Sequence, residues 1–159
     1  KPDIVIDLCA YKFGMTAFMS QITAHSDTRV LTVNHEGTDD SAWFDVLKSR
    51  PWAGNVSKAY WNVNSPTGLN IDPFIIGCRS AVVFVNYHTY EPVMRVVNLV
   101  KEKMDKVGFI FHADDHMDMP RVTTEFAKEI GVQKIVGIYN PPGGTWCSNG
   151  MFIYRRPGA

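Results

Sequence analysis

Two kinds of hydrophobic pattern alternate along the chain. Short apolar runs rich in β-branched residues are typical of buried strands, and longer stretches with apolar residues every three or four positions are typical of amphipathic helices. These patterns predict strands over residues 3–10, 28–36, 55–63, 80–88, 108–114, 133–140 and 150–156, and helices over 14–25, 39–50, 89–108 and 119–131, with a short helix within 64–77. The clearest helix is 89–108, because Val93, Val96, Val97, Val100 and Met104 share one face.

The order of these elements predicts the fold. Strands that alternate with helices form a mostly parallel sheet with right-handed crossovers and helices on both faces. The last two predicted strands are joined only by a Pro/Gly loop, so the final one is predicted to enter antiparallel. We therefore predict an α/β, Rossmann-like fold with seven strands, in which only the last strand, around Met151 to Arg155, is reversed.

Composition limits the class of protein. The 159 residues fit one domain over residues 1–159, and because the chain starts at Lys1, three residues before its first strand, we expect a domain excised from a longer protein. Sixteen basic and sixteen acidic residues cancel, which argues against a nucleic-acid partner. No apolar run is long enough for a membrane span and no signal pattern opens the chain, so a cytoplasmic location without a membrane partner is expected.

Acidic residues stand where a buried strand ends. Asp114 and Asp115 close the predicted strand 108–114, and Asn86 lies near the end of the preceding strand. Neighbouring parallel strands lie about 5 Å apart, so these oxygens can converge on one Mg²⁺, Mn²⁺ or Ca²⁺ ion. A solvated acidic loop is the alternative that spacing alone leaves open.

A histidine follows the same strand end. His88 lies two residues beyond Asn86 and just before the predicted helix 89–108. Near neutral pH an imidazole can accept the proton of a hydroxyl group, and a bound cation lowers the pKa of that hydroxyl. His88 is therefore a candidate general base, although a loop histidine can equally bond a backbone carbonyl.

Four segments resemble one enzyme family in the same order along the chain. The chain is similar to the cephalosporin-hydroxylase and rhamnosyl O-methyltransferase group of class I S-adenosylmethionine (SAM) methyltransferases in the segments KPDIVIDLCAYKFGMTAFMSQI, AVVFVNYHTYEPVMRVV, GFIFHADD and KIVGIYNPPGG with GMFIYRR. The resemblance implies the class I methyltransferase fold, SAM as cofactor and methyl transfer to a hydroxyl, with a sugar or glycan as the expected acceptor. It also implies a divalent cation held by Asn86, Asp114 and Asp115, with His88 and Asp114 as catalytic residues.

The same resemblance assigns a cofactor site along the ends of the first three strands. Its expected contacts are Asp7 with the amino group, the loop of Cys9 and Gly14 with the methionine part, Asn34 and Glu36 with the ribose, and Asn64 and Ser65 with the adenine edge. Three positions depart from the family pattern, since Cys9 replaces a loop glycine and Asn34 and Asn86 replace acidic residues.

Those departures keep other functions open. A domain of the same fold that has lost catalysis and serves as a binding or scaffold module of a larger protein is the main alternative, with other domains or a second copy of the chain as partners. A metal-dependent hydrolase that uses the same acids is a third possibility, which requires no SAM pocket.

Overall fold

The computed structural model describes residues 1–10, 12–65, 68–87, 89–112, 118–130, 136–138 and 149–158. Its strands are β1 (Ile4–Leu8), β2 (Arg29–His35), β3 (Val56–Trp61), β4 (Ser80–Val85), β5 (Lys106–His112), β6 (Val136–Ile138) and β7 (Asn149–Arg155). Its helices are α1 (Gly14–Thr23), α2 (Ser41–Lys48), α3 (Asp72–Ile75), α4 (Tyr90–Lys103) and α5 (Met119–Ile130).

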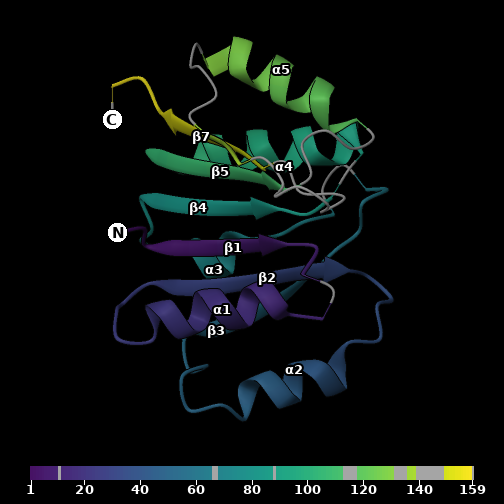
Figure 1. Cartoon of the computed structure of the whole chain (residues 1–159), viewed down its shortest axis with the longest axis vertical. Helices are drawn as coiled ribbons and strands as arrows, with labels where there is room; N and C mark the ends of the chain where they lie inside the picture. The colour runs from purple at the N-terminus through teal and green to yellow at the C-terminus, as the bar shows by residue number, and fades with distance from the viewer. Residues whose placement is uncertain are drawn as a thin grey trace.

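These strands form one sheet in the order β3-β2-β1-β4-β5-β7-β6 (Figure 1). Strands β1 to β5 pair in parallel, and β7 pairs antiparallel with both β5 and β6. The predicted Rossmann-like fold with a reversed last strand is confirmed. The reversal of β7 agrees with the length of its connection, because only ten residues separate β6 from β7 and a parallel neighbour needs a crossover of a dozen or more.

One face of the sheet carries the larger hydrophobic core. Helices α3, α4 and α5 cover this face, and the odd-numbered side chains of β4 and β5 point into it. Val93, Val96, Val97 and Val100 of α4 are fully or almost fully buried, as the periodicity of the sequence predicted. Phe126 of α5 packs edge-to-face against Phe109, at a ring distance of 5.0 Å.

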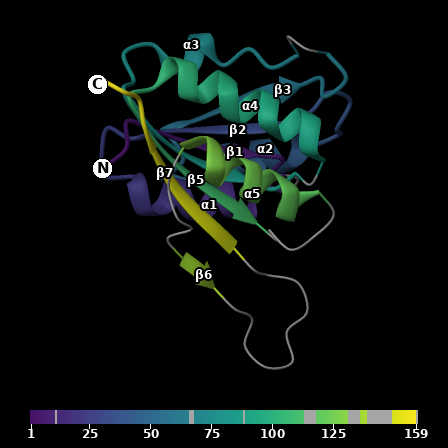
Figure 2. The same cartoon turned by 90° about the horizontal axis from the view of Figure 1, so that it is seen from above.

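Helices α1 and α2 cover only part of the other face (Figures 1 and 2). The core there is smaller and lies mainly against β1, β2 and β3, with Phe13, Met19 and Leu47 as its helix-side members. Among the residues that the structure describes, none of the helices has both the length and the apolar character that a bilayer crossing requires.

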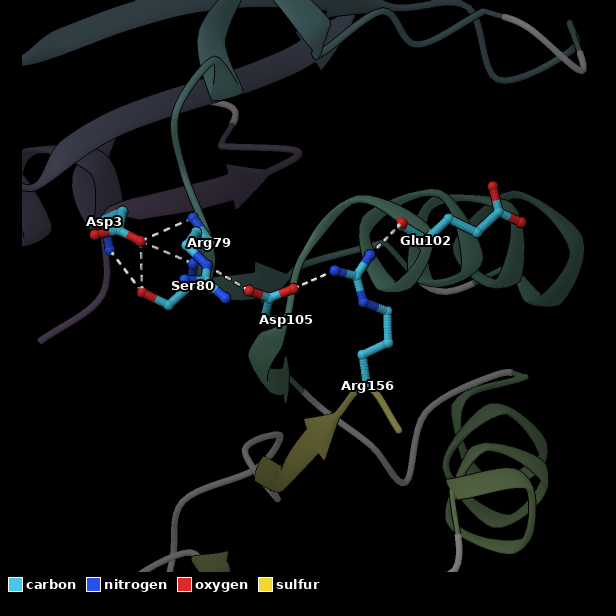
Figure 3. Close-up of polar contacts among 6 residues, drawn as sticks. All are labelled: Asp3, Arg79, Ser80, Glu102, Asp105 and Arg156. Atoms are coloured by element: carbon cyan, nitrogen blue, oxygen red, sulfur yellow. Dashed lines mark hydrogen bonds and ion pairs between the residues drawn. The ribbon is translucent and has the colours of Figure 1, made fainter. Parts of the chain in front are cut away.

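Polar contacts fix the edge of the sheet where the parallel strands begin (Figure 3). The carboxylate of Asp3 accepts hydrogen bonds from the backbone N–H of Arg79 at 2.9 Å and of Ser80 at 2.8 Å. Asp105 accepts one from Arg79 Nε at 2.6 Å and another from Arg156, which follows β7. These contacts lower the pKa of Asp105, Arg79 being the first cause, and they tie the reversed strand to the start of β5.

The predicted helix over 89–108 was too long. Helix α4 ends at Lys103, because Met104 is extended and the backbone N–H groups of Asp105 and Lys106 donate to the carbonyl of Arg79 at 2.8 and 3.2 Å. Residues 106–108 belong to β5. Tertiary pairing with the neighbouring strand outweighs the helical periodicity at this point.

Truncating Phe126 tests whether the α5 face holds the fold together. Phe126→Ala removes a fully buried ring from the Phe109, Phe111 and Phe152 cluster, and a core Phe→Ala change typically costs about 3–5 kcal/mol. Urea unfolding monitored by circular dichroism should show this loss. The control Ile76→Ala, at a side chain that is 74% exposed, should change the unfolding free energy by less than about 0.5 kcal/mol.

Candidate functional site

The chain changes direction between the ends of β1 and β4. Leu8 and Val85 lie side by side in the sheet, β1 continues into α1 on one face, and β4 continues into α4 on the other. Asn86 joins the two ends, since its backbone N–H donates to Leu8 O at 3.1 Å and its side-chain Nδ2 donates to Cys9 O at 3.4 Å. In open α/β sheets the crevice at such a switch point is where ligands bind.

The loop between β1 and α1 holds an unusual backbone conformation. Cys9 has a φ of 67° and Phe13 a φ of 59°, both in the left-handed region. For a residue other than glycine this region costs roughly 1–2 kcal/mol. Sequence reasoning identified Cys9 as the substituted glycine position but missed Phe13, which no motif marks.

Gly14 plays a different part from the one that loop glycines usually play. It is the first residue of α1, its φ is not in the left-handed region, and among the described residues no atom lies within 4 Å of a Cβ built on it. The space beside Gly14 is therefore open, as a close approach of a ligand to the backbone requires.

Asp7 is a buried carboxyl group at the end of β1. The residue is 1% exposed, and its Oδ2 accepts a hydrogen bond from the Thr16 hydroxyl of α1 at 2.5 Å. The Thr16 hydroxyl oxygen also lies 3.1 Å from that of Thr32 on β2. Among the described residues Asp7 Oδ1 has no hydrogen-bond partner. Burial raises the pKa of Asp7 to about 6, even though the hydrogen bonds from Thr16 lower it.

Asn34, predicted to contact the ribose, forms a hydrogen bond with a second buried carboxylate. Its Nδ2 donates to Asp40 Oδ2 at 2.7 Å, and Asp40 is only 2% exposed. Lys58 Nζ and the Tyr60 hydroxyl complete the group at 2.8 and 2.9 Å from Asp40 Oδ1. Burial alone would raise the pKa of Asp40, but these hydrogen bonds outweigh burial and lower it. Asp40 fixes the orientation of the Asn34 amide.

The other predicted cofactor contacts lie on loops. Glu36 is exposed at the turn after β2, and Asn64 is exposed after β3. Ser65 lines a cavity of about 400 Å³ beside α4. The loop is closed tightly at Gly68, where a Cβ would lie 2.0 Å from Asn62 O, so only glycine fits there. The ribose and adenine contacts of these side chains stay predictions.

An aromatic group that the sequence did not reveal lies at the ends of β2, β3 and β4. The ring of His35 stacks on Trp61 with centroids 5.9 Å apart and lies 5.0 Å from the ring of Tyr87. Cys9 Sγ lies 3.5 Å from His35 Nε2. Burial lowers the pKa of His35. These residues come from four separate segments, so no local sequence pattern predicts that they are in contact.

The predicted base and both predicted metal-binding aspartates, His88, Asp114 and Asp115, lie outside the described residues. Within the described ranges no group of three or more His, Cys, Asp or Glu side chains is placed to hold a metal ion. The segment after the acidic stretch is nevertheless anchored, because Asp118 Oδ2 accepts a hydrogen bond from the Tyr90 backbone N–H at the start of α4, at 3.1 Å.

Comparison with known proteins gives a likeness of structure without a likeness of sequence. No protein-family model and no curated protein matches the chain, so the resemblance to the cephalosporin-hydroxylase group stays a prediction. Solved structures do match. The methyltransferase domain of the bacterial protein CtHen1 superposes with a TM-score of 0.61 at 11% identity, over 98% of this chain and 91% of that one.

Two further structures agree with this. A candidate O-methyltransferase from Klebsiella pneumoniae has a TM-score of 0.63 at 10% identity, over 97% of this chain and 73% of its own. An RNA methyltransferase from Salinibacter ruber, solved with S-adenosyl-L-homocysteine, has a TM-score of 0.55 at 10% identity, over 99% and 82%. At such low identity the likeness establishes the fold alone, and that fold is the one found in class I methyltransferases.

Proposed function

We propose that the protein is a SAM-dependent O-methyltransferase that acts on a hydroxyl group of a sugar or glycan and is assisted by a divalent cation. The observation that carries the proposal is the buried Oδ1 of Asp7 at the end of β1, next to the switch point, which has no hydrogen-bond partner in the described part of the chain. A buried carboxylate oxygen without a partner is costly, and the ammonium group of a ligand would relieve that cost.

The residues around Asp7 fit a zwitterionic ligand such as the methionine part of SAM. The open space beside Gly14 lets a ligand approach the start of α1, where the positive end of the helix dipole attracts a carboxylate. Glu36 and Asn34 would take the ribose, and Asn64 and Ser65 the adenine. The Salinibacter ruber structure with S-adenosyl-L-homocysteine has the same fold, which supports this choice of ligand.

SAM, when bound, supplies an electrophilic methyl group. His88 would accept the proton of the acceptor hydroxyl, whose oxygen would receive the methyl group that SAM supplies, leaving S-adenosylhomocysteine. Asn86, Asp114 and Asp115 would hold the cation that lowers the pKa of this hydroxyl. Much of the rate enhancement would come from holding two substrates in line.

A scaffold domain of the same fold is the second candidate. Specific observations favour it, since Cys9 places a side chain where the resemblance expects glycine, and Asn34 is occupied by Asp40. Binding of SAM separates the two candidates, because a scaffold should bind neither SAM nor S-adenosylhomocysteine.

Replacing Gly14 with valine tests the cofactor site. The new side chain would fill the open space beside α1, so Gly14→Val should abolish SAM binding in calorimetry while the melting temperature stays nearly unchanged. Gly54→Val is the matched control, because no described atom lies within 4 Å of a Cβ at that remote loop position either. Undiminished SAM binding by Gly14→Val would place the pocket elsewhere.

Asp7→Asn should change stability and ligand binding in opposite directions. Burial raises the pKa of Asp7 to about 6, so the folded state binds the carboxyl proton more tightly than the unfolded state does. The stability that this proton contributes is fully present below pH 3.8, the ordinary pKa, and is lost as the pH rises through 6. At pH 8 the amide should therefore stabilise the fold, by up to about 3 kcal/mol. SAM affinity should fall at least tenfold, since the ammonium loses its carboxylate. Equal SAM affinity of both proteins at pH 8 would remove Asp7 from the binding site.

The cation site can be tested by thermal unfolding. Mg²⁺ or Mn²⁺ at roughly ten times its dissociation constant should raise the melting temperature by about 3 °C. Asp114→Asn combined with Asp115→Asn should remove this shift, and Asn86→Asp should enlarge it by adding a negative charge. If Mg²⁺, Mn²⁺ and Ca²⁺ all leave the melting temperature unchanged, with and without SAM, the acidic pair is a solvated loop.

A further inference from the structure

Half of one sheet face has no helix over it in the part of the chain that the structure describes. On the α4 side of β4 and β5, Val83, Phe109 and Phe111 are fully buried. On the opposite side Phe84 near the end of β4 is buried in the smaller core, but Val82, Ile110 and Ile153 are only half-buried, and Figure 1 shows no helix in front of β4 and β5 there. We call this surface the open half-face.

The open half-face is hollowed at one end. Gly108 contributes no side chain in the middle of β5, and it lies between Val82 and Ile153 in the sheet register. The result is a depression of about 200 Å³ that these three residues line together with Lys1 and Lys106. A groove of this kind between half-buried apolar side chains accepts an apolar ridge from another element.

The chain also carries an apolar ridge that nothing in its described part covers. Phe18 and Ile22 lie one turn apart on α1 and are 58% and 66% exposed. Helix α1 lies on the same side of the sheet as the open half-face and next to it (Figure 1). One side of the molecule therefore presents both a ridge and a groove, side by side.

We propose that the ridge on α1 of one copy packs into the open half-face of a second copy, and reciprocally, so that the protein is a two-fold symmetric dimer. A two-fold axis parallel to the strands and midway between two facing sheets places each α1 over β4 and β5 of the other copy. Both helices then form one layer between the two sheets. Such a contact is isologous, since each copy gives the ridge and takes it.

The distribution of charge favours this orientation of α1 on the other copy over the opposite one, in which the two ends of the helix would be exchanged. Helix α1 runs back from the end of β1 to the start of β2, so its C-terminal end lies at the edge where β5 begins. Lys106 and Arg155 pair in the register at that edge, are exposed, and take part in no ion pair among the described residues.

An axis parallel to the strands keeps each helix end at this edge. The negative end of the α1 dipole then meets Lys106 and Arg155 of the other copy. Helix α1 has no basic residue in its last turn. Asp27, which follows it, has a fully exposed side chain that forms an ion pair at 3.7 Å with the exposed Lys1 of its own copy. Acidic and basic groups thus face each other across the contact, around an apolar centre, as in stable interfaces.

Light scattering and sedimentation of the 159-residue chain test the dimer. At about 100 µM, where a dissociation constant near 1 µM leaves almost all chains paired, the measured mass should be twice 17.9 kDa. Phe18→Glu and Ile22→Glu should each weaken dimerisation at least tenfold without unfolding the chain. Ile76→Glu is the matched control, an equally exposed apolar residue near α3 on the opposite face, and it should leave the mass unchanged.

A charge exchange tests the direction of packing. Asp27→Lys alone and Lys106→Glu with Arg155→Glu should each weaken the dimer, and the combination of all three should restore it. A monomeric mass for the unmutated chain, a dimer that Phe18→Glu leaves intact, or a failure of the combined exchange to restore the dimer would overturn the proposal. None of these results depends on whether the chain binds SAM.

Discussion

Burial of apolar side chains between the sheet and helices α4 and α5 is the constraint on which the rest of the structure depends. Val83, Phe109 and Phe111 of β4 and β5 lie in this layer. Val97 of α4 and Phe126 of α5 lie there too, and all five side chains are fully buried. Burial of a large apolar side chain contributes roughly 1.5–3 kcal/mol, more than the exposed ion pairs of this chain can supply. The sheet can therefore tolerate costly features at its edge.

Those features gather where the parallel strands end. The left-handed backbone of Cys9 and Phe13, the partnerless oxygen of Asp7 and the buried Asp40 all lie at or beside this edge. The left-handed backbone and the unsatisfied Asp7 oxygen are unfavourable for folding alone, and strained or unsatisfied groups that persist in a fold are reasons to look for function. Both oxygens of Asp40 accept hydrogen bonds from within the chain. Of the two carboxylates, Asp7 is the one with an oxygen that has no partner among the described residues, and a ligand could supply that partner.

The two faces of the sheet are unequal in a way that bears on assembly. The face under α4 and α5 is closed, whereas the core on the α1 side buries Phe84 of β4 but leaves Val82 and Ile110 only half-buried. A half-buried apolar strip on the sheet beside an exposed apolar strip on a helix leaves hydrophobic burial incomplete within one copy. The proposed catalytic site lies at the strand ends and the proposed contact between copies lies on the sheet face, so the two are physically separate.

The sequence by itself determined the order and type of the elements, because strand and helix periodicity are local properties that side-chain spacing encodes. It also determined the reversal of β7, since the ten residues between β6 and β7 are too few for the crossover that a parallel neighbour needs. Only the tertiary structure decided where α4 ends, because pairing of Asp105 and Lys106 with Arg79 overrides the apolar repeat of residues 89–108. Local spacing also could not predict two side-chain groups, because each joins residues from different segments. These are the polar group of Asn34, Asp40 and Lys58 and the aromatic group of His35, Trp61 and Tyr87. Contacts between distant segments depend on how the sheet brings them together, and that is a property of the folded chain.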